Sequence, residues 1–266
     1  MSSAPAADAF DLSDTRAIPF ARLFRVELRK TVDTRAGRWL VGVTAGAALL
    51  TDVIFLIVVT AKDVSSSYGD FVAGAAFLTQ VLLPVLGIML VTSEWSQRTA
   101  MTTFALEPRR MRVFLAKLLA GISLTAFVIA FALVVGLVCN LLFAVFQGQS
   151  ADWTFGWTGF LGFLATQTFA MLGGFALACL LLNTPAAIVV FFVYRWVLPG
   201  LFALGSALMA WFEDLAPWLD FQSASGELYE LPLTGDQWAH LVVSGLLWLV
   251  LPLVIGVWRI LRAEVK

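Results

Sequence analysis

Apolar residues occur along the chain in six long runs that short polar segments separate. The runs cover residues 39–61, 71–92, 115–146, 157–182, 186–212 and 238–258. Each supplies the ~20 residues that a helix needs to cross ~30 Å of hydrocarbon. The pattern predicts an all-α integral membrane protein in which residues 38–266 form a domain of six transmembrane helices.

The boundary between the fourth and fifth runs depends on one short signal. Asn183, Thr184 and Pro185 interrupt a stretch without charged residues that extends to Arg195. Proline lacks the helix donor and disfavours helical geometry in the residue before it. A break here gives an even number of crossings, so both termini are expected on the same side. A single long helix would instead move the C-terminus to the other side.

A basic amphipathic segment precedes the first run. Apolar residues recur in it at four-residue spacing, at Phe20, Phe24, Leu28 and Val32. Arg22, Arg25, Arg29 and Lys30 occupy its other faces, and Glu27 is a further charged residue of this segment. We expect residues 17–37 to form an elbow helix in the membrane interface, with Arg and Lys reaching anionic headgroups. The alternative is a cytoplasmic extension. Residues 1–16 are rich in Ala, Ser and Asp and are predicted to be disordered.

Composition and charge placement agree with this topology. The chain is 60% apolar and 13% charged, whereas a soluble domain carries about 25% charged residues. With the N-terminus inside, every Lys and Arg except Lys62 and Arg195 lies on the cytoplasmic side, as the positive-inside rule requires. Residues 213–236 are acidic, contain no Lys or Arg, and are expected outside. They form either short re-entrant helices shielded by protein or a plain acidic hairpin.

Few side chains in the sequence suggest catalysis. There is no phosphate-binding G-x-x-x-x-G-K-[ST] motif and only one histidine, His240, so neither an ATP site nor a metal site is expected in this chain. Cys139 and Cys179 both lie in apolar runs and are interpreted as core residues. We therefore expect that the chain is not an enzyme by itself and does not bind nucleic acid.

Two charged side chains, Asp52 and Arg195, stand well inside the runs, where Gln80 and Gln167 are polar side chains that could meet them. An isolated charge at this depth costs at least ~2.5 kcal/mol. We expect Asp52 and Arg195 to pair, or each to meet a polar group such as Gln80 or Gln167. A structural pair between helices is favoured over a substrate site.

A charged island, residues 93–119, separates the second and third runs. Its charged members are Glu94, Arg98, Glu107, Arg109, Arg110, Arg112 and Lys117. An island this basic belongs on the cytoplasmic side, where a soluble partner would act on the membrane domain. The basic cluster from Arg109 to Lys117 is expected mainly to fix topology and to bind phospholipid.

These features together resemble the permeases of ATP-binding-cassette type-2 exporters. The resemblance covers the chain from about Ile18 and includes the basic elbow with Glu27-Leu28-Arg29-Lys30 and the six runs. It also includes a pattern after the second run: Glu94, Thr99, an apolar stretch over 101–106, Pro108, Arg109-Arg110 and Lys117. The family's usual Gly before the Thr is replaced by Arg98.

The resemblance implies a coupling segment over residues 93–112, with Glu94 to Leu106 as a coupling helix that docks in a separate ATPase subunit. The residues implied in this coupling are Glu94, Arg98, Thr99, Met101, Thr102 and Phe104, with Asn183 and Thr184 as a second contact. Glu94 would bridge to Arg98 or to the partner; otherwise it is a solvated carboxylate at a helix end.

The resemblance also implies an assembly and a task. Two ATPase subunits, which bind the ATP and Mg²⁺, would join two permease copies, expected as a homodimer in the bacterial cell membrane. The second and fifth helices would line the path, and the loop after the fifth would form an external lid. The expected cargo is amphipathic or apolar, such as a drug or antimicrobial peptide. The alternatives are a non-transporting anchor or sensor subunit and an integral membrane enzyme.

Overall fold

The structure is a computed structural model that describes residues 18–97 and 99–262. Every regular element in these two ranges is helical. Six helical stretches are long and apolar enough to cross a membrane: Arg35–Lys62, Tyr68–Ser96, Arg110–Gln147, Gly156–Leu181, Thr184–Leu208 and Gly235–Arg262. The all-α class and six helical stretches capable of crossing a membrane are therefore confirmed for the described residues, as is typical of a multi-pass membrane protein. The expected tail 1–16 and Arg98 lie outside the described residues.

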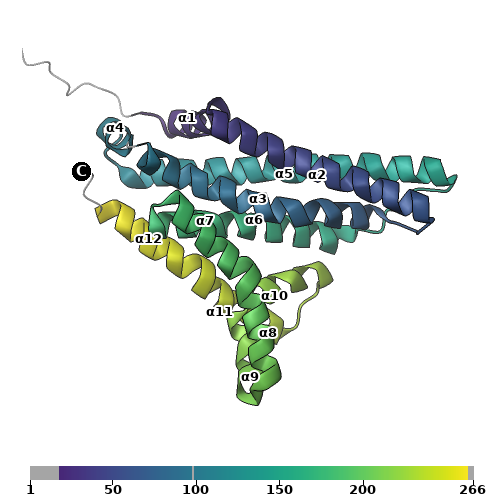
Figure 1. Ribbon diagram of the computed structural model, residues 1–266. Coiled ribbons are helices and arrows are strands. Elements are labelled where there is room, and N and C mark those ends of the chain that lie inside the picture. Colours follow the sequence, from purple (N-terminus) through teal and green to yellow (C-terminus); the bar gives the residue numbers. More distant parts are fainter. Residues whose placement is uncertain (1–17, 98, 263–266) are drawn as a thin grey trace, which may run out of the picture.

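Four helices form a central bundle (Figure 1). They are α2 (Arg35–Lys62), α3 (Tyr68–Ser96), α5 (Arg110–Gln147) and α6 (Gly156–Leu181). Helices α3 and α6 approach most closely at glycines, because a Cβ on Gly174 would lie 2.3 Å from the Pro84 carbonyl oxygen. Small residues permit such close backbone contact where lipid provides no hydrophobic drive. Helix α5 begins at Arg110, so the third run extends further into the charged island than residues 115–146.

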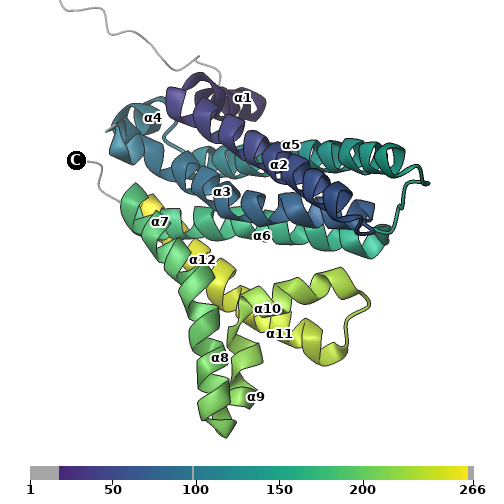
Figure 2. The ribbon, with the colours of Figure 1, turned by 45° about the vertical axis from the view of Figure 1, so that its right-hand side comes forward.

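The fifth and sixth crossings form an arm beside this bundle. The fifth consists of α7 (Thr184–Phe192), η1 (Val193–Val197) and α8 (Leu198–Leu208), and the sixth of α11 (Gly235–Gly245), η3 (Leu246–Val250) and α12 (Leu251–Arg262). Helices α7 and α12 pack on α6, and α8 lies away from the bundle in both views (Figures 1 and 2). Both η1 and η3 are π-helical turns, which occur often at functional sites.

The break before the fifth crossing is confirmed by local hydrogen bonds. The Asn183 side chain caps α7, because its Oδ1 accepts from the Ala186 N–H at 3.0 Å. Pro185 occupies the first turn of α7, where its missing N–H costs nothing. The same three residues that interrupt the apolar pattern thus end one helix and start the next.

The segment between the fifth and sixth crossings is helical and is not a plain hairpin. It contains α9 (Ala210–Leu219), α10 (Phe221–Gly226) and η2 (Glu227–Glu230). Helix α9 packs on α8 and α11, and η2 packs on α6. A hydroxyl–hydroxyl hydrogen bond of 3.0 Å between Tyr229 and Thr166 connects η2 to α6. Of the two expectations for this segment, the plain hairpin is wrong and short helices are present; that they are re-entrant stays a prediction.

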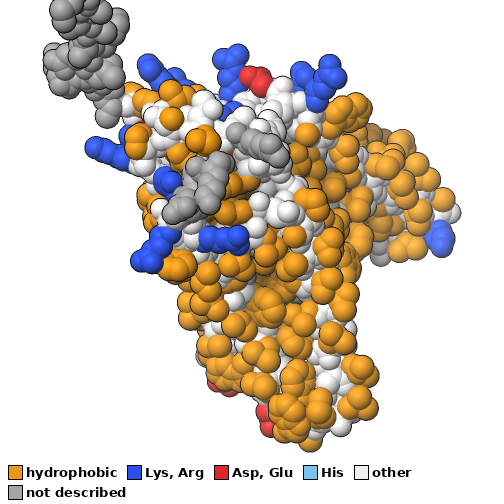
Figure 3. All heavy atoms as spheres, turned by 60° about the vertical axis from the view of Figure 1, so that its left-hand side comes forward, with side chains coloured by type: hydrophobic (Ala, Val, Ile, Leu, Met, Phe, Trp, Pro, Cys, Tyr) orange, Lys and Arg blue, Asp and Glu red, His pale blue; other side chains and the backbone are white. Residues whose placement is uncertain are grey.

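Two short helices lie at one end of the bundle. Helix α1 (Phe20–Asp33) crosses this end, and α4 (Ala100–Leu106) connects α3 to α5 (Figure 1). We call this end, which also holds the last turn of α12, the basic end. Lys and Arg side chains gather there, while hydrophobic side chains cover most of the face below (Figure 3).

Candidate functional site

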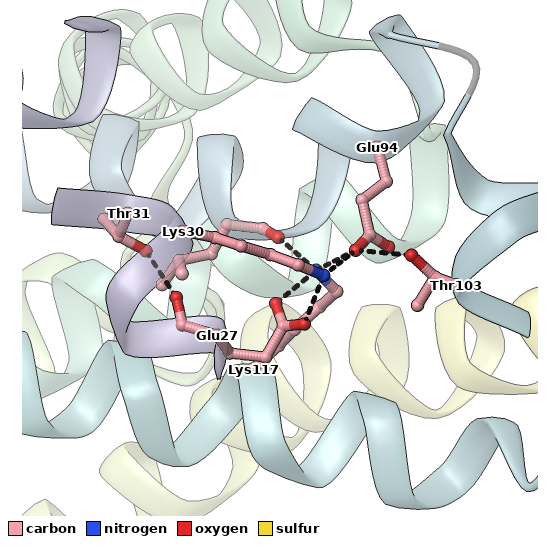
Figure 4. Close-up of polar contacts among 7 residues, drawn as sticks. Glu27, Lys30, Thr31, Glu94, Thr103 and Lys117 are labelled. Atoms are coloured by element: carbon pink, nitrogen blue, oxygen red, sulfur yellow. Dashed lines mark hydrogen bonds and ion pairs between the residues drawn. The ribbon is translucent and has the colours of Figure 1, made fainter. Parts of the chain in front are cut away.

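Four charged side chains converge under α1 at the basic end (Figure 4). Lys117 Nζ lies 2.7 Å from Glu27 Oε2 and 3.2 Å from Glu94 Oε1. Lys30 Nζ lies 2.7 Å from Glu27 Oε1 and 2.7 Å from Glu94 Oε1. We call Glu27, Lys30, Glu94 and Lys117 the charge cluster. Its two acids and two bases balance, and the cluster joins α1, α3 and α5.

Burial makes this cluster different from a surface ion pair. The side chains of Glu27, Glu94 and Lys117 are 6%, 7% and 9% exposed. Burial lowers the pKa of Lys30, but hydrogen bonds and charge from Glu27 and Glu94 outweigh it and hold the pKa above its ordinary value of 10.5. Removing one member of such a group leaves an uncompensated buried charge.

Helix α4 is connected directly to the charge cluster. Thr103 donates a hydrogen bond of 3.1 Å to Glu94 Oε1 (Figure 4). Phe104 packs against Trp95, and the Arg110 guanidinium lies 4.9 Å from the centre of the Phe104 ring. Met101 and Thr102 are exposed on α4. One face of α4 is therefore fixed to the bundle, and another is exposed.

The structure corrects the expected coupling helix. Glu94 belongs to the last turns of α3, and α4 begins only at Ala100, so Glu94 to Leu106 do not form one helix. Glu94 is also neither solvated nor directed at a partner, because its carboxylate is engaged by Lys30, Lys117 and Thr103. Thr99 precedes α4 and is exposed. Arg98, the other expected partner of Glu94, is outside the described residues.

The elbow residues divide into two groups. Arg22, Arg25 and Arg29 are exposed on α1, where Arg29 pairs with Asp33 at 2.7 Å. Glu27 and Lys30 instead direct their charged atoms into the charge cluster. The exposed arginines fit the expected contact with headgroups, whereas the Glu27–Lys30 pair fastens α1 to the bundle.

Most of the basic cluster that was expected to bind phospholipid is used inside the protein. Arg112 pairs with Glu107 at 2.6 Å, and Arg110 donates to the Ile260 carbonyl at 2.7 Å. Lys117 is buried in the charge cluster. Arg109 alone among these four has an exposed residue position. Three of the four residues therefore connect α5 to its neighbours, and contact of the cluster with phospholipid stays a prediction.

The second expected contact lies at the basic end as well. Thr184 Oγ1 lies 2.7 Å from Thr92 Oγ1 and 3.0 Å from Ser96 Oγ, both on α3. Asn183 is exposed beside it. The hydrogen bonds place the start of α7 next to the end of α3, so Asn183 and α4 belong to the same end of the molecule.

Asp52 and Arg195 do not pair. Arg195 donates a hydrogen bond of 2.6 Å to Gln80, which is the alternative partner named above. Asp52 is fully buried, and neither of its oxygens accepts a hydrogen bond from the described part of the chain. Gln167, also fully buried, donates to the Ala76 carbonyl at 3.2 Å. The expected pair is thus corrected, and the two charges have separate surroundings.

A cavity of about 520 Å³ opens beside the charge cluster. Its wall comes from α1, α2, α3, α4 and α5 and includes Glu27, Lys30 and Glu94. Apolar side chains such as Leu40, Leu86 and Met89 provide much of the rest. The cluster therefore lies at an open space between the helices.

Thr103 and the roles of Glu27 and Lys117 were missed from the sequence. Two signals for them exist. Glu27 follows Leu23 and Phe24 by four and three residues, which places an acid on the apolar face of α1. Lys117 lies within the third apolar run, so a buried acid was needed to balance it. Nothing in the sequence marks Thr103, because its contact depends on the turn between α3 and α4.

Neither a family model nor a curated protein matches this chain. In the described ranges no group of three or more His, Cys, Asp or Glu is placed to hold a metal ion. Support for a function therefore comes from the topology, from the charge cluster and from the surroundings of Arg195.

Proposed function

We propose that the chain is the transmembrane permease subunit of an ATP-driven exporter of the ATP-binding-cassette type-2 class. A separate ATPase subunit would bind ATP and Mg²⁺, and two permeases and two ATPases would form the transporter. The cargo would be an amphipathic or apolar molecule, moved across the bacterial cell membrane by alternating access.

The observation that supports this proposal most strongly is the connection between α4 and the charge cluster. Helix α4 exposes Met101 and Thr102 at the basic end, where Asn183 is exposed as well. Its Thr103 is bonded to Glu94, and Glu94 is bonded to Lys30 on α1. A force applied to the exposed face of α4 would therefore reach α1, α3 and α5 through short polar contacts.

The mechanism follows from this connection. Closure of the ATPase dimer would move α4 as a rigid element, and the charge cluster would transmit the movement to three helices at once. Because interfaces of this kind have discrete packings, a small shift at α4 can change the side to which a central cavity opens. ATP can favour one state only by its difference in affinity for the two states.

Cysteine crosslinking tests the proposed docking site. Thr102→Cys on α4 and, as the matched control, Ser150→Cys between α5 and α6 would be made with the buried Cys139 and Cys179 replaced by alanine. Both target positions are exposed. Thr102→Cys in intact cells is expected to crosslink to a copurifying ATPase subunit, and Ser150→Cys is expected to react only with an impermeant maleimide added outside.

Two results would contradict the proposal. One is labelling of Thr102→Cys from outside the cell. The other is a purified, functional complex that contains no nucleotide-hydrolysing subunit. The second result would favour a non-transporting anchor or sensor subunit, and chemical activity of the purified chain alone would favour a membrane enzyme.

A further inference from the structure

The second polar region of the protein is a pocket of about 260 Å³ between the bundle and the arm. We call it the arm pocket, and residues from α3, α6, α7, η1, α10, η2 and η3 line it. Its polar lining residues are Gln80, Thr166, Tyr194, Arg195, Gln222, Ser225 and Tyr229. Arg195 lies ~17 Å along the fifth crossing from Thr184 at ~1.5 Å per residue, which is near the middle of ~30 Å of hydrocarbon.

Arg195 is the only Lys, Arg, Asp or Glu side chain that lines this pocket. Within residues 18–97 and 99–262, no carboxylate lies within ion-pair distance of its guanidinium. Asp220, which caps α10, is the nearest acid whose charge acts on it. A guanidinium has five N–H donors, and Gln80 accepts from one of them at 2.6 Å.

Other contacts hold the cation in place without neutralising it. The Arg195 guanidinium carbon lies 5.4 Å from the centre of the Trp196 ring, an arrangement that stabilises a cation by the charge distribution of the ring. Trp196 in turn packs edge-on against Phe77 at 5.7 Å. The positive charge is thus positioned from α3 and η1, and no acid of the described residues forms an ion pair with it.

The surroundings of Arg195 are suited to an anionic group with an attached apolar part. Gln222 lines the pocket with an amide that can donate a hydrogen bond, and a guanidinium binds carboxylate or phosphate with two parallel N–H bonds. Apolar side chains, Phe169, Phe191 and Leu249, line the same pocket. A pocket for a cationic ligand would instead carry an acid, and no acid lines this one.

We propose that this pocket binds the anionic head of an amphiphile, with Arg195 as the residue that holds its carboxylate or phosphate. The proposal deepens the proposed function, and it rests on that function for the statement that the bound ligand is the transported cargo. This role for Arg195 replaces the expected structural pair of Asp52 and Arg195, because the structure does not contain that pair. The expected cargo class becomes an amphiphile with one negative group.

Binding to the chain alone tests the pocket without any ATPase. The chain would be placed in phosphatidylcholine nanodiscs, and binding of ³³P-labelled dodecyl phosphate would be measured by scintillation proximity, with empty nanodiscs subtracted. We expect saturable binding that unlabelled dodecyl phosphate displaces and dodecyltrimethylammonium, which has the same tail and the opposite charge, does not.

Substitutions test whether Arg195 is the residue that holds the anionic group. Arg195→Gln is expected to weaken binding at least ~10-fold, because a tenfold change in affinity corresponds to only ~1.4 kcal/mol of lost ion pairing. The affinity of Arg195→Lys should lie between those of the parent chain and Arg195→Gln, since the point charge of an ammonium group replaces the planar guanidinium with its parallel N–H donors. Arg38→Gln, the same substitution at an exposed arginine of α2, should bind as the parent does. If Arg195→Gln fails to fold, Gln222→Glu places an acid in the pocket and should abolish binding.

The proposal is overturned if dodecyl phosphate shows no saturable binding or if the cationic amphiphile competes equally well. Unchanged binding in folded Arg195→Gln or Gln222→Glu also overturns it. These outcomes leave the proposed function intact, because that function is tested by the ATPase contact at α4. Conversely, anion binding without a copurifying ATPase would retain the pocket and reject the transporter.

Discussion

The two charged regions of this protein differ in whether opposite charges balance their side chains. In the charge cluster, two acids and two bases satisfy one another under α1, with distances of 2.7 to 3.2 Å. In the arm pocket, Arg195 has an amide partner and no acid. A balanced cluster holds helices together, whereas an unbalanced charge beside a cavity remains available to a ligand. The comparison predicts different consequences when each region is mutated.

The largest effect is expected from Lys117→Met. The substitution leaves Glu27 and Glu94 with one base between them, and removal of one partner of a buried pair costs about 3–5 kcal/mol. We expect a clear loss of stability, measured as the midpoint of unfolding in SDS after reconstitution in mixed micelles. Adding Glu94→Gln should recover part of the loss. Strictly additive losses would mean that the two residues do not interact.

The next effect is expected at Asp52, with the opposite sign. Its buried carboxylate has no hydrogen-bond donor among the described residues, and an unsatisfied buried polar group costs about 1–3 kcal/mol. Asp52→Leu should therefore raise stability in the same assay, with Asp70→Leu, which removes a capping carboxylate at the start of α3, as a control that lowers it. Destabilisation by Asp52→Leu would reveal a partner for this acid.

A smaller effect on stability, with a larger one on function, is expected from Thr103→Val. The variant loses one hydrogen bond to Glu94, a change of about 1–2 kcal/mol, and keeps the four charges of the cluster. We expect an assembled complex in which ATP hydrolysis no longer depends on cargo. Thr103→Ser, which keeps the hydroxyl that donates to Glu94, is the matched control. Equal behaviour of the two variants would exclude transmission through the Thr103–Glu94 bond.

The smallest effect is a dependence on pH at Lys30. Its pKa is raised in the folded protein, so the stabilisation is complete below the unfolded pKa near 10.5 and is lost as pH rises through the higher folded value. The difference in melting temperature between the parent chain and Lys30→Met should be constant from pH 7 to 9 and should narrow above pH 10.5. The side chain is 42% exposed, so solvent reduces the effect. A difference that already narrows below pH 9 would contradict this.

Much of the fold could be predicted from the sequence because membrane crossing requires long apolar runs. The break at Asn183 was also predictable, since a capping residue and a proline act locally. The arm and the charge cluster were not. Lys117 and Glu27 are distant in sequence, and their contact depends on how α1 crosses the bundle. The sequence shows that Arg195 is a charged residue inside an apolar run, but its partner depends on which side of η1 faces α3.

In the proposed mechanism, nucleotide-driven movement of the ATPase enters the permease at α4 and changes the side of the membrane from which a ligand reaches the arm pocket. Labelling of Ser225→Cys, which lines that pocket, tests it directly in the complex purified with its ATPase and reconstituted in vesicles. An impermeant maleimide should reach the cysteine from one side of the membrane without nucleotide and from the opposite side after trapping with ATP and vanadate. Labelling from the same side in both states would contradict the account.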